Sequence, residues 1–201
     1  MYPWEHLLLG YVLFSVYAHW RYRESPTGGQ TIAVVAGSLL PDIVDKPLAW
    51  TFEIVESAYA IGHSIFVAPF VGVAVYVLAR RFDRPRTGVA FMIAYLSHLA
   101  SDIVYPVAFG MPIEPRVVLW PLASPPSSTI EGGFIERATF YVRRFVVEMT
   151  TGGLSTFVRF QLFFVGAVTL LWLYDGAPVA MDAYRFLRRL MNERLFSKRG
   201  R

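Results

Sequence analysis

The residues most able to do chemistry in this chain are histidines and aspartates at short, regular spacings. His98 and Asp102 are four residues apart, so a helix would place them on one face. Asp42 and Asp45 are three residues apart, beside a proline. Imidazole suits zinc or iron and carboxylate suits manganese, so the mixed set favours zinc, with manganese or iron as alternatives, as one or two ions. The candidate ligands are His6, Asp42, Asp45, His63, His98 and Asp102.

The elements that must position these residues are apolar segments long enough to cross a bilayer. Apolar residues make up 55% of the 201 residues and charged residues only 17%, whereas a soluble domain is roughly 25% charged. The chain has no cysteine, which excludes disulfides and thiolate metal sites. The composition predicts an all-α polytopic membrane bundle of about five spans. The expected spans are residues 3–20, 28–44, 57–78, 87–109 and 156–173.

The distribution of lysine and arginine predicts how these spans are oriented. Thirteen of the nineteen basic residues follow the first span, join the third to the fourth, or lie in the C-terminal tail. Basic residues favour the cytoplasmic side, so we expect an inner-membrane protein with its N-terminus outside and its C-terminus in the cytoplasm. This orientation brings all six candidate ligands to the outer level of the membrane, where ionisable residues are costly and therefore point to function.

Two further helices are expected outside the spans. The connection 110–155 is rich in proline in its first half, and its second half shows helical periodicity over about 134–149, which predicts an amphipathic helix at the outer interface. Residues 180–196 predict a basic surface helix that binds anionic lipid. We therefore expect a membrane domain over 1–178, which includes the outer loop, and a cytoplasmic tail over 179–201.

Other residues are weaker candidates for chemistry. Asp45, or a glutamate such as Glu53 in the loop before the third span, could act as a general base. No Gly-x-Ser-x-Gly elbow, phosphate-binding glycine loop or base-stacking motif occurs, so nucleic-acid binding is not expected. An intramembrane histidine can also serve only as a hydrogen-bonding residue between helices, and Asp-x-x-Asp can be a helix cap. Candidate phosphate-binding residues are Arg116, Arg143 and Arg144.

The order of these motifs resembles a known family. A histidine in the first span is followed by Leu40-Pro41-Asp42-Ile43-Val44-Asp45, Gly62-His63-Ser64 and Ser97-His98-Leu99-Ala100-Ser101-Asp102, and then by Trp120-Pro121. This order resembles membrane-bound metal-dependent hydrolases, including the LexA-binding inner-membrane putative hydrolases, over residues 1–125. The resemblance implies a helical membrane protein, the six ligands above, and a remote similarity to zinc-dependent phospholipase C.

Three functions remain open on the sequence. The first is a metal-dependent hydrolase of phosphoesters such as lipid headgroups, with membrane lipids as its surroundings and its substrate. The second is a transporter or metal-handling protein, because the second span is interrupted by glycine and proline. The third is a non-catalytic scaffold whose cluster holds a structural ion. The sequence leaves the oligomeric state open.

Overall fold

The computed structural model describes residues 1–126, 131–151, 153 and 155–199, with the backbone alone from residue 193 onward. Over this described part the chain is all-α, as expected, with seven α-helices, two short 3-10 helices and no strand. The α-helices are α1 (Pro3–Tyr22), α2 (Gly28–Trp50), α3 (Ala68–Arg81), α4 (Pro85–Val104), α5 (Phe134–Thr151), α6 (Thr156–Tyr174) and α7 (Ala180–Arg199). The 3-10 helices are η1 (Tyr105–Phe109) and η2 (Pro115–Val118).

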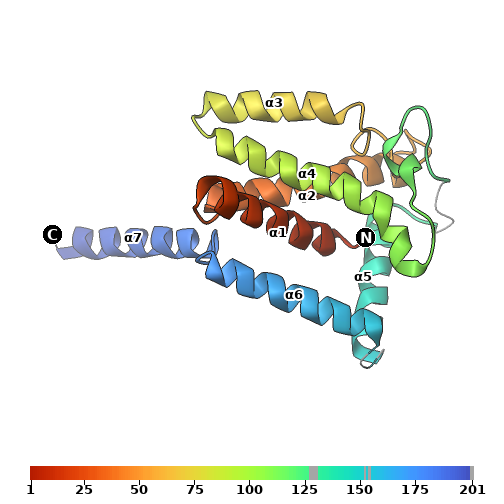
Figure 1. Ribbon diagram of the computed structural model, residues 1–201. Helices are drawn as coiled ribbons and strands as arrows, with labels where there is room; N and C mark the ends of the chain where they lie inside the picture. The colour runs from red at the N-terminus through yellow and green to blue at the C-terminus, as the bar shows by residue number, and fades with distance from the viewer. Residues whose placement is uncertain (127–130, 152, 154, 200–201) are drawn as a thin grey trace.

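The central helix pair is α2 and α4, and α1 and α3 pack on the same bundle (Figure 1). Two glycines allow the backbones to approach closely. A side chain at Gly37 of α2 would collide with the carbonyl oxygen of Phe91 in α4, and one at Gly10 of α1 would collide with the Ser38 hydroxyl. Small residues at such crossings are typical of helices that associate in membranes. The close approach sets the distance between the elements that carry the candidate ligands.

The second helix is longer than the sequence predicts. It was expected over 28–44, but it continues to Trp50 through Pro41 and Pro47. The Thr27 hydroxyl accepts a hydrogen bond from the Gln30 N–H, and the Gln30 side chain accepts one from the Thr27 N–H, so the helix begins with a capping box. Each interior proline removes one helical donor, and tertiary packing of the bundle tolerates this loss.

The predicted span 57–78 is wrong in its first half. Residues 51–67 form turns and bends, and α3 begins only at Ala68. The reason is that the N–H groups of Ala60, Gly62 and His63 donate to the carboxylate of Asp45 instead of to helical carbonyl groups. An apolar stretch that could have been helical is therefore folded around a buried acid.

Helix α6 contacts α1 through polar side chains near both of its ends. At one end Gln161 donates to the carboxylate of Glu5. At the other end the buried Asp175 carboxylate accepts hydrogen bonds from Tyr11 and Ser15, both at 2.7 Å, and lies 2.7 Å from His19 Nε2. The remainder of α6 is mostly exposed and apolar, as expected for a face toward lipid.

Two helices lie outside the bundle, close to their expected bounds. Helix α5 runs across the ends of the other helices, whereas α7 extends away at the opposite end (Figure 1). Helix α5 has no buried residue, and it contacts α2 through Phe134, whose ring stacks on Trp50 with centroids 6.2 Å apart. The tail helix predicted over 180–196 is α7.

Two of the helical segments described are long and apolar enough to cross a membrane, fewer than the five expected. They are Pro85–Phe109 and Thr156–Tyr174. Helix α3 has only 14 residues, or about 21 Å at 1.5 Å per residue, against a hydrocarbon core of about 30 Å. Helix α2 is long enough to cross, but it is less apolar, because the charged residues Asp42, Asp45 and Lys46 lie close together in its second half.

Candidate metal centre

Side chains from four parts of the chain meet at one end of the bundle. His6 lies in the first turns of α1, Asp42 and Asp45 near the end of α2, and His98 and Asp102 near the end of α4. His63 comes from the irregular segment 51–67. All six candidate ligands are buried. Helix polarity explains the meeting, because α1 starts at the end of the bundle where α2 and α4 finish (Figure 1).

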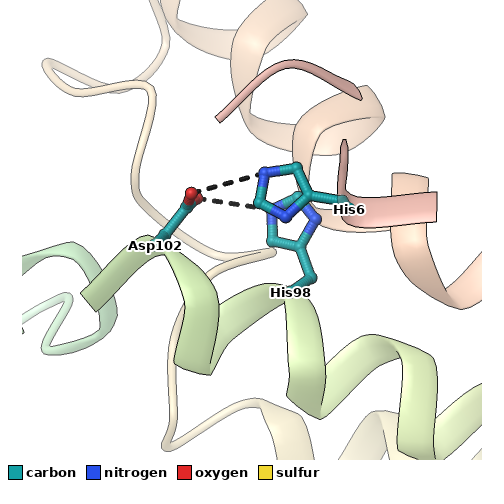
Figure 2. Close-up of side chains that lie close together, drawn as sticks. All are labelled: His6, His98 and Asp102. Carbon is teal, nitrogen blue, oxygen red and sulfur yellow. Dashed lines mark ion pairs between the residues drawn. The ribbon is translucent and has the colours of Figure 1, made fainter. Parts of the chain in front are cut away.

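One group of potential ligands joins α1 to α4. The Nε2 atom of His6 lies 3.3 Å from Asp102 Oδ1, and Nε2 of His98 lies 3.5 Å from Asp102 Oδ2. Figure 2 shows the two imidazole rings lying over one another beside this carboxylate, with ring centroids 3.7 Å apart. Their ligand atoms lie within 4.8 Å of one another, a spacing at which all three could hold one ion.

A second group shares His98 with the first. Nε2 of His63 lies 3.1 Å from Nε2 of His98, and Asp42 Oδ1 lies 3.6 Å and 3.8 Å from these two nitrogen atoms. Asp102 Oδ2 is 3.6 Å from His63 Nε2, so the two groups form one continuous cluster. The two groups of potential ligands could together hold either one ion or two.

The hydrogen bonds of the Nδ1 atoms place a proton on Nδ1 in each of the three rings. Nδ1 of His98 lies 2.6 Å from the Ser38 carbonyl oxygen, which can only accept, and Nδ1 of His63 lies 2.8 Å from Asp45 Oδ2. Nδ1 of His6 lies 3.0 Å from the Ser101 hydroxyl, which itself donates to the His98 carbonyl oxygen. Each Nδ1 must therefore carry a proton and donate it.

The three rings therefore direct their Nε2 atoms into the same buried space, and each Nε2 is a free metal-binding atom when its ring is neutral. The Nε2 atoms of His63 and His98 face one another at hydrogen-bond distance, and Nε2 of His6 faces a carboxylate oxygen and has no hydrogen-bond partner. Lone pairs and carboxylates at these distances repel one another unless a cation or an additional proton lies among them. Three imidazole nitrogen atoms and two carboxylates are a donor set that zinc, manganese or iron accepts.

Asp45 differs from the other aspartate residues of the cluster. Its Oδ2 accepts from the N–H groups of Ala60 and His63 and from His63 Nδ1, and its Oδ1 accepts from the Gly62 N–H, all within 3.0 Å. Both oxygen atoms are thus occupied. A carboxylate that receives the second N–H of a ligating histidine orients that ring and raises its basicity. The geometry favours this positioning role over the ligand and base roles predicted from the sequence.

The remaining predicted residues lie outside the cluster. Glu53 is exposed after α2 with a φ of 52°, and no hydrogen bond or ion pair within the described residues joins it to the site. Arg116 makes two hydrogen bonds to Glu114 at 2.7 and 2.6 Å, and these hold the pKa of the Glu114 carboxyl below its usual range. Arg143 and Arg144 are exposed on α5. Their proposed contact with phosphate remains a prediction.

Three residues that the sequence did not identify as part of the site complete it. Lys46 lies 2.5 Å from Asp42 Oδ2, and its i,i+4 spacing from Asp42 was the available signal. Ser38 and Ser101 orient the His98 and His6 rings, the first through its backbone carbonyl group. A backbone acceptor has no signature in sequence, so the role of Ser38 could only come from the structure.

Comparison with known proteins agrees with a membrane setting. No curated protein and no solved structure matches the chain. The model of the family described as YdjM inner membrane protein matches residues 1–181, which include every residue of the cluster. The chain therefore belongs to the YdjM inner membrane protein family.

Proposed function

We propose that this protein is a metal-dependent hydrolase of phosphoesters, with lipid headgroups as its substrates. One observation carries the proposal, namely the three Nε2 atoms that converge with the carboxylates of Asp42 and Asp102. The residues that would hold the metal are His6, Asp42, His63, His98 and Asp102. Zinc fits this donor set best, and manganese or iron are the alternatives. A bound divalent cation would supply the Lewis acidity that phosphoester hydrolysis uses.

The chain's own residues would prepare this site in three ways. Asp45 and the Ser38 carbonyl group keep two imidazole rings in the tautomer that presents Nε2. Lys46 holds the outer oxygen of Asp42, so that the other oxygen remains directed at the imidazoles. All five ligands are buried, and the exclusion of water strengthens each electrostatic contact.

The proposed orientation places the cluster toward the outer face of the inner membrane. The opposite end of the bundle carries Arg80, Arg81, Arg84 and Arg86 between α3 and α4, and basic connections favour the cytoplasm. In this proposal all of α1, α2, α3, α4 and α6 lie at membrane depth. The N-terminus is outside and α7 is cytoplasmic. Helix α5, which crosses the ends of the bundle, then lies along the outer interface.

A transporter or metal-handling protein is the second candidate, and α1 supplies an observation for it. Polar residues continue along α1 beyond His6, because Tyr11, Ser15 and His19 meet Asp175 in the other half of the helix. Ser38, whose buried hydroxyl has no hydrogen-bond partner, lies against Gly10 between these two polar clusters. The third candidate, a structural ion, is supported by the burial of the cluster.

One experiment separates the three candidates. Purified protein in nanodiscs is analysed for bound metal and then for release of phosphate or phosphorylated headgroups from the lipids. We expect bound metal and headgroup release in the native protein, loss of both in His98→Ala, and no change in the control His19→Ala. Metal without release, combined with metal uptake into proteoliposomes, would establish the transporter. Metal without release or uptake would establish a structural ion.

A further inference from the structure

His63 is the only one of the six candidate ligands that does not lie on a helix. The other five belong to α1, α2 and α4, whereas His63 lies in the irregular segment 51–67. A ligand carried by a loop is held less precisely than one carried by a helix. Because Nε2 of His63 nevertheless lies only 3.1 Å from Nε2 of His98, contacts from outside the segment must fix its position.

The peptide unit that joins Gly62 to His63 is held from two sides. Its N–H group donates to Oδ2 of Asp45, in α2, at 3.0 Å, and the same oxygen atom lies 2.8 Å from Nδ1 of the His63 ring. Its carbonyl group, which belongs to Gly62, accepts a hydrogen bond of 2.6 Å from the hydroxyl group of Tyr95, in α4. Because a trans peptide unit is planar and its two polar groups point in opposite directions, these bonds fix both the place and the plane of the unit.

Gly62 is also confined on the side of α2. A Cβ atom on this residue would lie 2.9 Å from the carbonyl oxygen of Pro41 and 3.0 Å from its Cα atom, so the two backbones are in direct contact. The segment is therefore lodged between α2, which blocks its movement, and α4, which holds it through the hydroxyl group of Tyr95.

Tyr95 is well placed to hold this segment because α4 also carries His98. The two residues are three positions apart, which puts them on the same side of the helix. The Tyr95 side chain is fully buried, and its ring stacks on Phe91 with centroids 5.9 Å apart. Its backbone nitrogen atom lies against Gly37, where α2 and α4 approach closely. One helix therefore carries a candidate ligand and, one turn earlier, the group that holds a second ligand opposite it.

The separation of the two imidazole nitrogen atoms suits a shared ion. Two ligands of a tetrahedral zinc ion, each about 2.0–2.1 Å from the metal, lie roughly 3.3 Å apart. The distance of 3.1 Å between Nε2 of His63 and Nε2 of His98 is close to this value. A displacement of the His63 segment would change this separation directly.

We infer that Tyr95 is a positioning residue of the metal site, because its hydroxyl group holds the peptide unit of His63 so that Nε2 of this ring faces Nε2 of His98 across one ion. The phenol itself touches neither the ion nor a substrate. The inference rests on the proposed function for the identity of the ion, but it concerns metal binding and not hydrolysis.

Tyr11 provides a matched control at the other end of the bundle. Its side chain is also buried, and its hydroxyl group donates a hydrogen bond of 2.7 Å to Asp175. A buried tyrosine hydroxyl group usually has a hydrogen-bond partner whatever its function. Tyr95→Phe and Tyr11→Phe should therefore both lower the thermal stability, and only Tyr95→Phe should also change the metal site.

The test measures metal affinity and the surroundings of the histidine rings. Zinc affinity is determined by competition with a chelating dye, on purified protein in detergent micelles. We expect Tyr95→Phe to weaken zinc binding by about tenfold or more, as is usual when a group that orients a ligand is lost, and Tyr11→Phe to bind zinc as the native protein does. In nitrogen NMR spectra of metal-free protein with labelled histidine, Tyr95→Phe should shift the His63 signals, whereas Tyr11→Phe should shift those of His19, which shares Asp175 with Tyr11.

The outcomes separate this inference from the proposed function. Native zinc affinity in Tyr95→Phe would overturn the inference, and an equal loss of affinity in Tyr11→Phe would do so too, because it would trace the loss to general destabilisation. Unchanged His63 signals in Tyr95→Phe would also overturn it. A native protein that binds no metal would overturn the proposed function, and the His63 signals would then decide whether Tyr95 positions the ring. Zinc binding that depends on Tyr95, without release of phosphorylated headgroups, would overturn the hydrolase alone.

Discussion

Nε2 of His63 and Nε2 of His98 face one another at 3.1 Å, although the Nδ1 atom of each ring is already committed as a donor. Asp45 receives one of these protons and the Ser38 carbonyl oxygen receives the other. Their approach therefore needs either a second proton on one of the two rings or a cation close by, because two lone pairs pointed at each other in a buried site repel. This relationship is the strongest single indication that the cluster is built for a cation.

The first prediction concerns metal content. His98→Ala removes the only ligand shared by the two groups of the cluster, so bound metal should fall by roughly tenfold or more. His19→Ala is the matched control, because its Nε2 contacts Asp175 at the other end of α1. Elemental analysis of the purified proteins measures both. Equal metal in His98→Ala and the native protein would mean that the cluster is a hydrogen-bonded polar core.

The second prediction distinguishes a positioning residue from a ligand. Asp45→Asn keeps the shape of the side chain, but its amide nitrogen cannot accept the hydrogen bonds that one carboxylate oxygen accepts now. Metal affinity should fall by about 10- to 100-fold, as is usual when an orienting partner of a ligand is lost. Competition with a chelating dye gives the affinity.

The control and a further readout sharpen this test. Glu53→Gln, at an exposed position, should leave the metal affinity unchanged. The spectrum of a cobalt-substituted sample should show the same coordination number in Asp45→Asn as in the native protein. A change in the number of ligands would show that Asp45 coordinates the metal itself.

The third prediction concerns the crossing of α2 and α4. Gly37→Ala places a methyl group against the Phe91 carbonyl oxygen, which is backbone and cannot rotate away. We expect a loss of about 1–3 kcal/mol in the free energy of unfolding, measured by denaturant titration in mixed micelles. Gly29→Ala lies in the same helix, with its nearest neighbouring atom 3.8 Å away, and should be neutral or raise the stability by up to about 1 kcal/mol.

The fourth prediction tests the proposed orientation. The chain has no cysteine, so a single introduced cysteine reports its own side of the membrane. Pro125→Cys, in the connection beyond η2, should react with an impermeant thiol reagent in intact cells. Arg84→Cys, between α3 and α4, should react only after the membrane is permeabilised. The reverse pattern would place the cluster on the cytoplasmic side.

The extent to which the fold was predictable differs between elements. Helices α5 and α6 were expected close to their observed bounds, because a strong helical periodicity and a continuous apolar run are local properties of the sequence. The span expected over 57–78 was wrong in its first half. Apolar content alone does not reveal that three backbone N–H groups donate to the carboxylate of Asp45, which lies 15 to 18 residues earlier in the chain. Hydropathy cannot register such a long-range hydrogen bond.

The sequence by itself determined the membrane character of the chain and the residue types that could bind a metal, because composition and local spacing carry both. Only the tertiary structure decided which of these residues meet. It placed His6 against Asp102 and Asp45 against Nδ1 of His63, and it brought Arg137 of α5 to the ring of Trp50. These outcomes depend on the close approach of α1, α2 and α4 and on where α5 lies. They arise from packing between distant segments, which no local pattern in the chain encodes.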